Sequence, residues 1–310
     1  MRHLFLYLLA ITSLASSATL IRLAEAPLEM IGFWRLLASA IFLLPFALKM
    51  GDLRRHFKIA GRASGIKLST ELGMVLLSGL FFFAHLWTYF YSAQHTRIAN
   101  CMIIFATNPI FVSLASFIVF REKLTLRLGL AYFFAALGVY TLVSHSLSFE
   151  EGFLLGDLSA LLSAALFAIY LVTGKKARLT MANSEYTFIA YALTAFLFGT
   201  TGWLANKSFI GYESITWIAI FLSVIFPTLL GHVLFSYLMK RMNLNFMSCG
   251  KLLEPAISAV FAYLIFAEKM TSETVSAFFF TTLAVLILFL PLGNFSFLKR
   301  SAPSQTSKER

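Results

Sequence analysis

The chain has 310 residues, of which 59% are hydrophobic and only 13% are charged, and it carries 34 phenylalanines and a formal charge of +11. A water-soluble fold has too little interior to bury so much apolar surface, so this composition excludes a soluble enzyme and a secreted disulfide scaffold. A transmembrane β-barrel is excluded as well, because its strands alternate apolar and polar residues, whereas the apolar runs here are continuous.

Ten apolar segments follow one another along the chain, each close to the ~20 residues that a helix needs to cross a hydrocarbon core of ~30 Å. They cover residues 3–21, 29–50, 72–96, 98–120, 128–149, 158–174, 186–206, 214–239, 245–267 and 274–298. Charged residues interrupt the interior of only two segments. Arg35 lies in the second segment, and Lys251 and Glu254 lie in the ninth. The sequence therefore predicts an all-α integral membrane protein with ten transmembrane helices.

The first segment also resembles a cleaved secretory signal, because Arg2 precedes an apolar run that leads to Ser16-Ser17-Ala18. The apolar run continues to Ile21, however. Its removal would leave nine spans and would break the alternation of charge between successive loops. We therefore expect this segment to be retained as the first transmembrane helix.

The basic residues fall almost entirely in alternate loops. If the amino terminus is cytoplasmic, the loops on the opposite side hold only Arg22, Arg97, Lys207 and Lys269 of the 25 lysines and arginines. This asymmetry is the positive-inside pattern, and it predicts a multi-pass protein of the bacterial inner (plasma) membrane with both termini in the cytoplasm. The basic residues form short anchors without interleaved aromatic residues, so we expect the lipid bilayer as a partner and no nucleic acid.

The two halves of the chain share the pattern P-x10-F-x-E-K-x-T at an offset of 146 residues. The aligned residues are Pro109, Phe120, Glu122, Lys123 and Thr125 in the first half and Pro255, Phe266, Glu268, Lys269 and Thr271 in the second. The pattern predicts two five-helix repeats, over residues 1–147 and 152–298, followed by a disordered cytoplasmic tail over 299–310. We expect Glu122 and Glu268 to cap or pair at helix ends.

An odd number of helices in each repeat has a topological consequence. Because five is odd, the second repeat must enter the membrane from the side opposite to the first. Inverted repeats of this kind are a recurring plan of secondary transporters, in which the substrate binds near the bilayer midplane between the two halves.

Three stretches carry a family resemblance. They are Phe33-Trp34-Arg35-Leu36-Leu37; Glu122-Lys123-Leu124-Thr125 with Gly129 and Gly138-Val139; and Leu253-Glu254-Pro255 leading to Phe266-Ala267-Glu268-Lys269. On these motifs the chain resembles the drug/metabolite transporter (DMT) superfamily, and within it the ten-helix EamA-like permeases. The resemblance extends from about residue 4 to 293. The resemblance implies an inner-membrane permease for small organic metabolites, in a family whose members export amino acids or import cofactors or nucleotides. The second repeat departs from the family pattern, because it lacks the glycines that follow the first motif.

The charged residues inside the spans are the first candidates for a substrate site. Each costs about 2.5–3.5 kcal/mol at a helix centre, so it must be paired or face a wet cavity. Lys251 and Glu254 lie three residues apart on one helix face. They either neutralise each other as a structural pair or bind a substrate that bears both signs, and in a third alternative Lys251 extends to the cytoplasmic surface. Arg35 either captures an anionic group or pairs with Glu25 or Glu29.

Glu254 and Asn108 occupy equivalent positions in the two repeats, and each immediately precedes a proline. A proline in mid-helix removes one backbone hydrogen bond and disfavours helical geometry at the preceding residue. Each repeat therefore places a polar side chain beside a kink, and we expect Thr107 and Asn108 to oppose Lys251 and Glu254 in a polar lining at the midplane.

The third segment adds His85 and Tyr89, which share a helical face. They either line the cavity, where an aromatic ring would stack on a planar or cationic substrate, or His85 and His232 merely bridge helices by hydrogen bonds. We include His85 and Tyr89 with Arg35, Thr107, Asn108, Lys251 and Glu254 in the candidate substrate site.

The alternative from another functional class is an intramembrane enzyme, and a channel is a further one, but the signatures of both are missing from the sequence. It contains neither H-E-x-x-H nor G-x-S-x-G, and it has no filter-like glycine loop of a channel. We therefore predict a secondary transporter, a monomer or weak homodimer, with no catalytic residue, no cofactor and no metal. Its expected substrate is an amino acid or related zwitterion moved by alternating access. The alternative is uptake of a cofactor-like cation or zwitterion such as S-adenosylmethionine.

Overall fold

The protein is described by a computed structural model that covers residues 2–49, 70–96, 98–122, 125–146, 154–266 and 272–289. Within these ranges the only regular secondary structure is helical. The helices are α1 (Arg2–Ala15), α2 (Ser17–Leu23), α3 (Leu28–Lys49), α5 (Thr70–His95), α6 (Ile98–Phe105), α7 (Asn108–Phe120), α8 (Leu126–Ser146), α9 (Leu154–Arg178), α10 (Asn183–Leu204), α11 (Ser214–Ser223), the π-helix η2 (Val224–Val233), α12 (Leu234–Met239), α13 (Leu244–Gly250), the 3-10 turn η3 (Lys251–Leu253), α14 (Glu254–Phe266) and α15 (Ser272–Phe289). The expected tail at 299–310 and the Glu268-Lys269 turn lie outside the described residues.

These helices form ten rods, because α1–α2, α6–α7, α11–η2–α12 and α13–η3–α14 each continue as one. Seven of the described rods are long and apolar enough to cross a membrane by length and composition. They are Arg2–Leu23, Leu28–Lys49, Thr70–His95, Leu154–Arg178, Asn183–Leu204, Ser214–Met239 and Leu244–Phe266. Shorter apolar helices, at Asn108–Phe120, Leu126–Gly138 and Val275–Ile287, belong to the other three. The prediction of an all-α, ten-helix membrane protein is confirmed.

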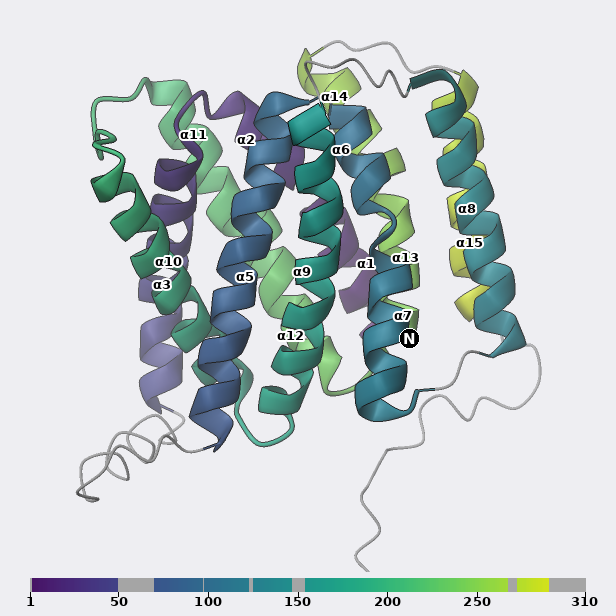
Figure 1. The fold of residues 1–310 in the computed structure, drawn as a ribbon, viewed down its shortest axis with the longest axis horizontal. Coiled ribbons are helices and arrows are strands. Elements are labelled where there is room, and N and C mark those ends of the chain that lie inside the picture. Colours follow the sequence, from purple (N-terminus) through teal and green to yellow (C-terminus); the bar gives the residue numbers. More distant parts are fainter. Residues whose placement is uncertain are drawn as a thin grey trace, which may run out of the picture.

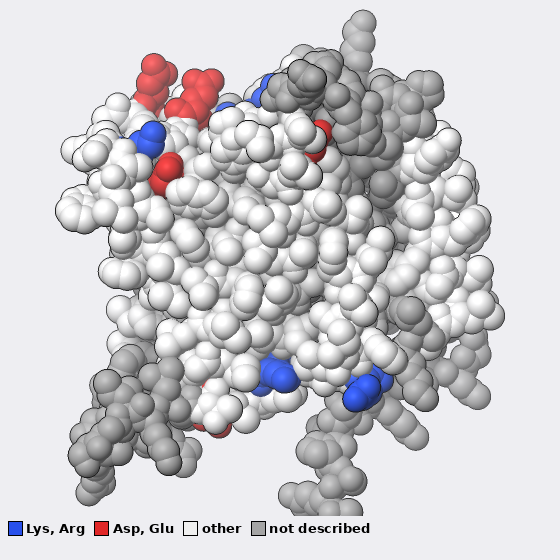
Figure 2. Space-filling model, in the orientation of Figure 1, with Lys and Arg blue, Asp and Glu red and all other residues white. Residues whose placement is uncertain are grey.

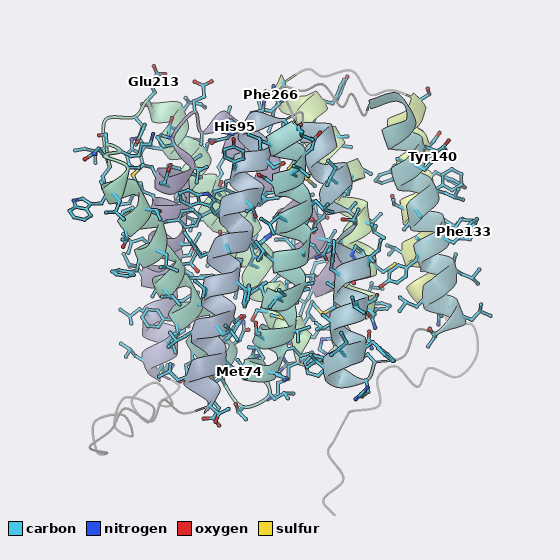
Figure 3. All side chains as sticks on the ribbon, in the orientation of Figure 1. Met74, His95, Phe133, Tyr140, Glu213 and Phe266 are labelled. Carbon is cyan, nitrogen blue, oxygen red and sulfur yellow. The ribbon has the colours of Figure 1, made fainter. Side chains whose placement is uncertain are left out.

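Successive rods run in opposite directions through the bundle, so the first rod of each half starts from an opposite end (Figure 1). Charged side chains on the face in Figure 2 gather at the two ends, and the broad band between them is uncharged. Side chains on α8 such as Phe133 and Tyr140 point away from the bundle (Figure 3) and are 58% and 66% exposed. An uncharged band with exposed aromatic residues is what a lipid-facing surface requires. The chain is a multi-pass integral membrane protein.

Contacts between the two halves are reciprocal. Equivalent helices pair with each other, α3 with α10 and α8 with α15. The extensive packing of α5 of the first half on α9 of the second is matched by the packing of α1 on η2. Reciprocal contacts of this kind are expected for two inverted copies related by a two-fold axis.

Two rods are interrupted at equivalent places, and both interruptions lie at the predicted proline kinks. The rod from Ile98 to Phe120 breaks at Ala106 and Thr107, just before Asn108 and Pro109. The rod from Leu244 to Phe266 passes through the 3-10 turn η3 just before Glu254 and Pro255. Irregular backbone at membrane depth is tolerated where it lines a cavity or is buried in protein.

Candidate functional site

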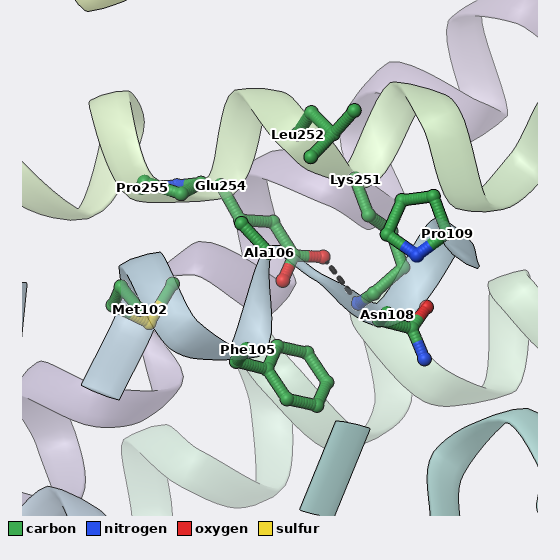
Figure 4. A pocket seen from close by; sticks show the side chains of 9 residues that line it. All are labelled: Met102, Phe105, Ala106, Asn108, Pro109, Lys251, Leu252, Glu254 and Pro255. Atoms are coloured by element: carbon green, nitrogen blue, oxygen red, sulfur yellow. Dashed lines mark hydrogen bonds and ion pairs between the residues drawn. The ribbon is translucent and has the colours of Figure 1, made fainter. Parts of the chain in front are cut away.

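The two interrupted helices meet at a small cavity (Figure 4). Its lining comes from both halves of the chain, and the residues are Met102, Phe105, Ala106, Asn108, Pro109, Lys251, Leu252, Glu254 and Pro255. The kink before Pro109 therefore faces the kink before Pro255. A second small cavity adjoins the first, since both are lined by Phe105, Lys251 and Glu254.

Lys251 and Glu254 form a buried ion pair in the shared wall of the two cavities. The Lys251 Nζ and Glu254 Oε1 atoms lie 2.5 Å apart, and the side chains are 6% and 5% exposed. Of the three alternatives that the sequence left open, the structure shows the ion pair, and it also places both residues in the linings of the cavities. The Lys251 ammonium stays beside Glu254 inside the bundle and does not extend to a surface.

Three aromatic rings surround the Lys251 ammonium. Its Nζ lies 4.8 Å from the ring centre of Phe167, 5.5 Å from that of Phe235 and 5.6 Å from that of Phe105. The electron-rich faces of aromatic rings attract cations, and the attraction is stronger where water is excluded. This aromatic cage, contributed by α6, α9 and α12, would bind a cationic group at the position that Lys251 fills.

Asn108 contributes a polar atom to the first cavity. Its amide Nδ2 donates to the backbone oxygen of Ala164 at 2.8 Å, and this bond connects the N-terminus of α7 to α9 in the other half. The Asn108 Oδ1 atom is buried and has no hydrogen-bond partner among the described residues. An amide oxygen without a partner in a low-dielectric site is an acceptor available to a ligand.

The second cavity lies between α1, α5, α9 and η2. Its lining residues are Leu14, Ser17, His85, Leu86, Tyr89, Phe105, Phe167, His232, Lys251 and Glu254. His85 and Tyr89, which the sequence predicts for the site, thus share one cavity with Lys251 and Glu254. The His85 Nδ1 atom lies 2.8 Å from the Ser163 Oγ atom on α9, so His85 also bridges two helices. The Tyr89 hydroxyl donates to the sulfur of Met102 at 3.2 Å.

His232 lines the second cavity although the sequence analysis left it outside the site. No hydrogen bond joins its ring to any residue that the structure describes, in contrast to His85. Ser17 and the aromatic wall of Phe105 and Phe167 were also missed. The one sequence signal for Ser17 is its spacing of four from Ser13, which is equally typical of close helix packing.

Two predicted site residues lie outside both linings. Thr107 is half-buried, and its hydroxyl donates to the backbone oxygen of Ile104 at 2.7 Å within its own broken helix. Arg35 is completely buried behind the second cavity, where its Nη1 atom donates to the Ser17 hydroxyl at 3.3 Å. Neither Glu25 nor Glu29 forms an ion pair with Arg35 in the described part of the chain.

Comparison with known proteins gives a family for this fold and site. The sequence model of the EamA-like transporter family matches residues 1–144 and again 154–290. An uncharacterized transporter of Archaeoglobus fulgidus is 25% identical over 262 residues, which cover 84% of this chain and 87% of that protein. A second uncharacterized transporter of the same organism is 26% identical over 243 residues, with 77% and 78% covered.

A solved crystal structure has the same fold. It superimposes with a TM-score of 0.73 at 14% sequence identity and covers 93% of this chain and 96% of that one. At this identity the likeness concerns the fold alone.

Proposed function

This chain belongs to the EamA-like transporter family, and on that premise we propose that it moves a small zwitterionic metabolite, such as an amino acid, across the inner membrane by alternating access. One observation carries the proposal. The Lys251–Glu254 pair lines both cavities at the meeting point of two interrupted helices, one from each half. A zwitterion can exchange with such a pair, since its carboxylate replaces Glu254 beside Lys251 and its ammonium replaces Lys251 beside Glu254.

The position of the pair suits alternating access. Substrate sites of inverted-repeat transporters lie between the repeats, where rocking of one half against the other opens the site to either side. The pattern of basic loop residues supports an orientation with both termini in the cytoplasm.

The runner-up, uptake of a cofactor-like cation or zwitterion such as S-adenosylmethionine, has weaker support. The linings of the two cavities contain one carboxylate, Glu254, and it is already paired with Lys251. The sulfonium of S-adenosylmethionine adds a positive charge to its carboxylate and ammonium, and no carboxylate in these linings is left to pair with that charge, which is unfavourable at a buried site. The aromatic cage alone favours such a cation.

Exchange from proteoliposomes tests the proposal. Vesicles containing the purified protein are loaded with a mixed pool of neutral amino acids, organic acids, organic cations and nucleotides, and the efflux of each compound is measured by mass spectrometry. We expect compounds that carry both a carboxylate and an ammonium to leave faster than from protein-free vesicles. Selective efflux of compounds with a net positive charge, including those that also carry a carboxylate, would overturn this assignment in favour of the runner-up. Failure of every compound to leave, with folded protein and with pH gradients of both signs, would overturn the proposal itself.

A further inference from the structure

Arg35 is a buried charge without a counter-charge. Its side chain is completely buried in α3, and none of the carboxylates in the described ranges lies within ion-pair distance of it. A guanidinium does not deprotonate in proteins, so Arg35 keeps its positive charge inside the bundle. The ring of Phe90 lies beside it, with its centre 5.5 Å from the guanidinium carbon.

The hydrogen bonds of Arg35 fix its orientation and leave one edge available. Its Nε atom donates to the Thr228 hydroxyl at 2.7 Å, while that hydroxyl donates to the backbone oxygen of Ser223 at 2.8 Å within η2. The Nη1 atom has one long bond of 3.3 Å to Ser17, and Nη2 has no partner among the residues described. The two Nη atoms together form the edge that binds a carboxylate or phosphate through two parallel hydrogen bonds.

This edge lies next to the second cavity. Ser17, the partner of Nη1, is itself in the lining of the second cavity. Tyr89 and His232, also in that lining, lie close enough to Arg35 for electrostatic interaction. Thr228 lies in the π-helical segment η2, and π-helical segments are rare and frequently found at functional sites.

The charges around the cavity do not balance. Lys251 and Glu254 cancel each other, which leaves the buried positive charge of Arg35 without a counter-charge among the described residues. A substrate with a net charge of −1 neutralises the site, whereas a neutral zwitterion leaves one excess positive charge and a cation leaves two. Charge compensation in a low-dielectric site therefore favours the anion most strongly.

We propose that the Nη edge of Arg35 binds an acidic group of the substrate, and that the preferred substrate is a small metabolite of net charge −1, such as an amino acid with an acidic side chain. This inference rests on the proposed function and refines it. The ammonium and one carboxylate of the substrate bind Glu254 and Lys251, and the additional acidic group reaches Arg35 past Ser17. Because Arg35 binds through a planar fork, lysine in its place does not restore the full contact.

The test uses two substrates of nearly equal size that differ in charge. Free glutamate and free glutamine are supplied to proteoliposomes containing the wild-type chain, Arg35→Gln or Arg35→Lys. We expect the wild type to transport glutamate at least 10-fold faster than glutamine. Arg35→Gln should lower the glutamate rate at least 10-fold and shift the preference toward glutamine, because without the Arg35 charge a neutral zwitterion leaves the site neutral. Arg35→Lys should give an intermediate glutamate rate.

Arg178→Gln is the matched control, because Arg178 is also a buried arginine but donates to backbone oxygens away from both cavities. It should change both rates by the same factor. Equal transport of the two substrates by the wild type, or an equal loss of both in Arg35→Gln, would overturn the inference and leave the proposed function standing. If Arg35→Gln does not fold, the wild-type preference alone decides the inference.

A further measurement distinguishes failure of the proposed function from failure of the inference about Arg35. If the wild type transports neither compound, vesicles are loaded with a mixed metabolite pool, and the net charge of the compounds that leave decides between the two failures. Selective efflux of monoanions without an ammonium group supports the role of Arg35 and overturns the zwitterion assignment, whereas efflux of neutral compounds or cations overturns the role of Arg35.

Discussion

Glu122 and Lys175 join the two halves of the bundle at one of its ends. The Lys175 Nζ and Glu122 Oε1 atoms lie 2.5 Å apart, and both side chains are largely buried. The same ammonium lies 4.9 Å from the ring centre of Phe120, at the end of α7. Glu122 thus pairs at a helix end, as the sequence predicts, and its partner lies in the other half.

A related contact lies at the opposite end of the bundle. There the guanidinium carbon of Arg22, at the end of α2, lies 5.6 Å from the ring centre of Phe266, which terminates α14 (Figure 3). Phe266 is the repeat equivalent of Phe120. Each half therefore places a basic residue from the end of its first rod against the phenylalanine that ends the fourth rod of the other half.

Breaking the Glu122–Lys175 pair should loosen that end of the bundle. In a Cys101→Ser background, the buried Cys249 on α13 is the remaining thiol and reports access from this end. Lys175→Met should raise the rate of maleimide modification of Cys249 at least 3-fold. Lys176→Met is the matched control, because Lys176 is exposed on the same helix turn and forms no ion pair with the described residues. Equal rates in the two variants would show that the pair does not hold this end closed.

Glu254→Gln should reduce transport at least 10-fold while the protein still inserts into the membrane. The change removes the carboxylate and leaves the Lys251 ammonium unpaired, and breaking a buried pair in this way costs about 3–5 kcal/mol. Transport is measured in proteoliposomes and folding by size-exclusion chromatography. The double variant Lys251→Met with Glu254→Gln removes both charges and serves as the control. If the pair were only structural, this double variant would fold and transport at the wild-type rate.

Two glycines of α8 should respond differently to alanine. A Cβ atom at Gly138 would stand 2.9 Å from a side-chain carbon of Thr281 and 3.0 Å from the backbone oxygen of Ala277, so Gly138→Ala should force α8 and α15 apart. Overpacking of this kind costs about 1–3 kcal/mol. A Cβ atom at Gly129 would meet none of the other described residues within 4 Å, so Gly129→Ala should stabilise the helix by about 0.5–1 kcal/mol. Thermal unfolding in detergent compares the two, and equal melting temperatures would contradict this packing.

Substitutions of the two histidines of the second cavity should affect stability and transport differently. His85→Leu removes the hydrogen bond to Ser163 and should cost about 1 kcal/mol of stability. His232→Leu removes no hydrogen bond to a described residue, so its melting temperature should stay near that of the wild type while transport falls. Both are measured by thermal unfolding and by proteoliposome exchange. A large loss of stability in His232→Leu would show that its ring has a structural role.

The architecture could be predicted from patterns along the chain that do not require knowing which helices are in contact. The length of the apolar runs set the ten rods, and a proline in each of two rods set the position of both interruptions. A spacing of three residues placed Lys251 and Glu254 on one face, where they form an ion pair. The repeat offset aligned the two kinks, and an odd number of helices in each repeat inverted the second copy.

Only the tertiary structure decided which residues from distant helices meet. The sequence offered Glu25 or Glu29 as partners for Arg35, but the structure gives it Ser17 and Thr228, the latter 193 residues away. The tertiary structure also places His232 in the lining of the second cavity and pairs Glu122 with Lys175. The physical reason is that lipid is as apolar as the interior of the bundle, so hydrophobic periodicity does not mark the inward face of a transmembrane helix. The rotation of each helix is set instead by side-chain packing against neighbours that are far away in the sequence.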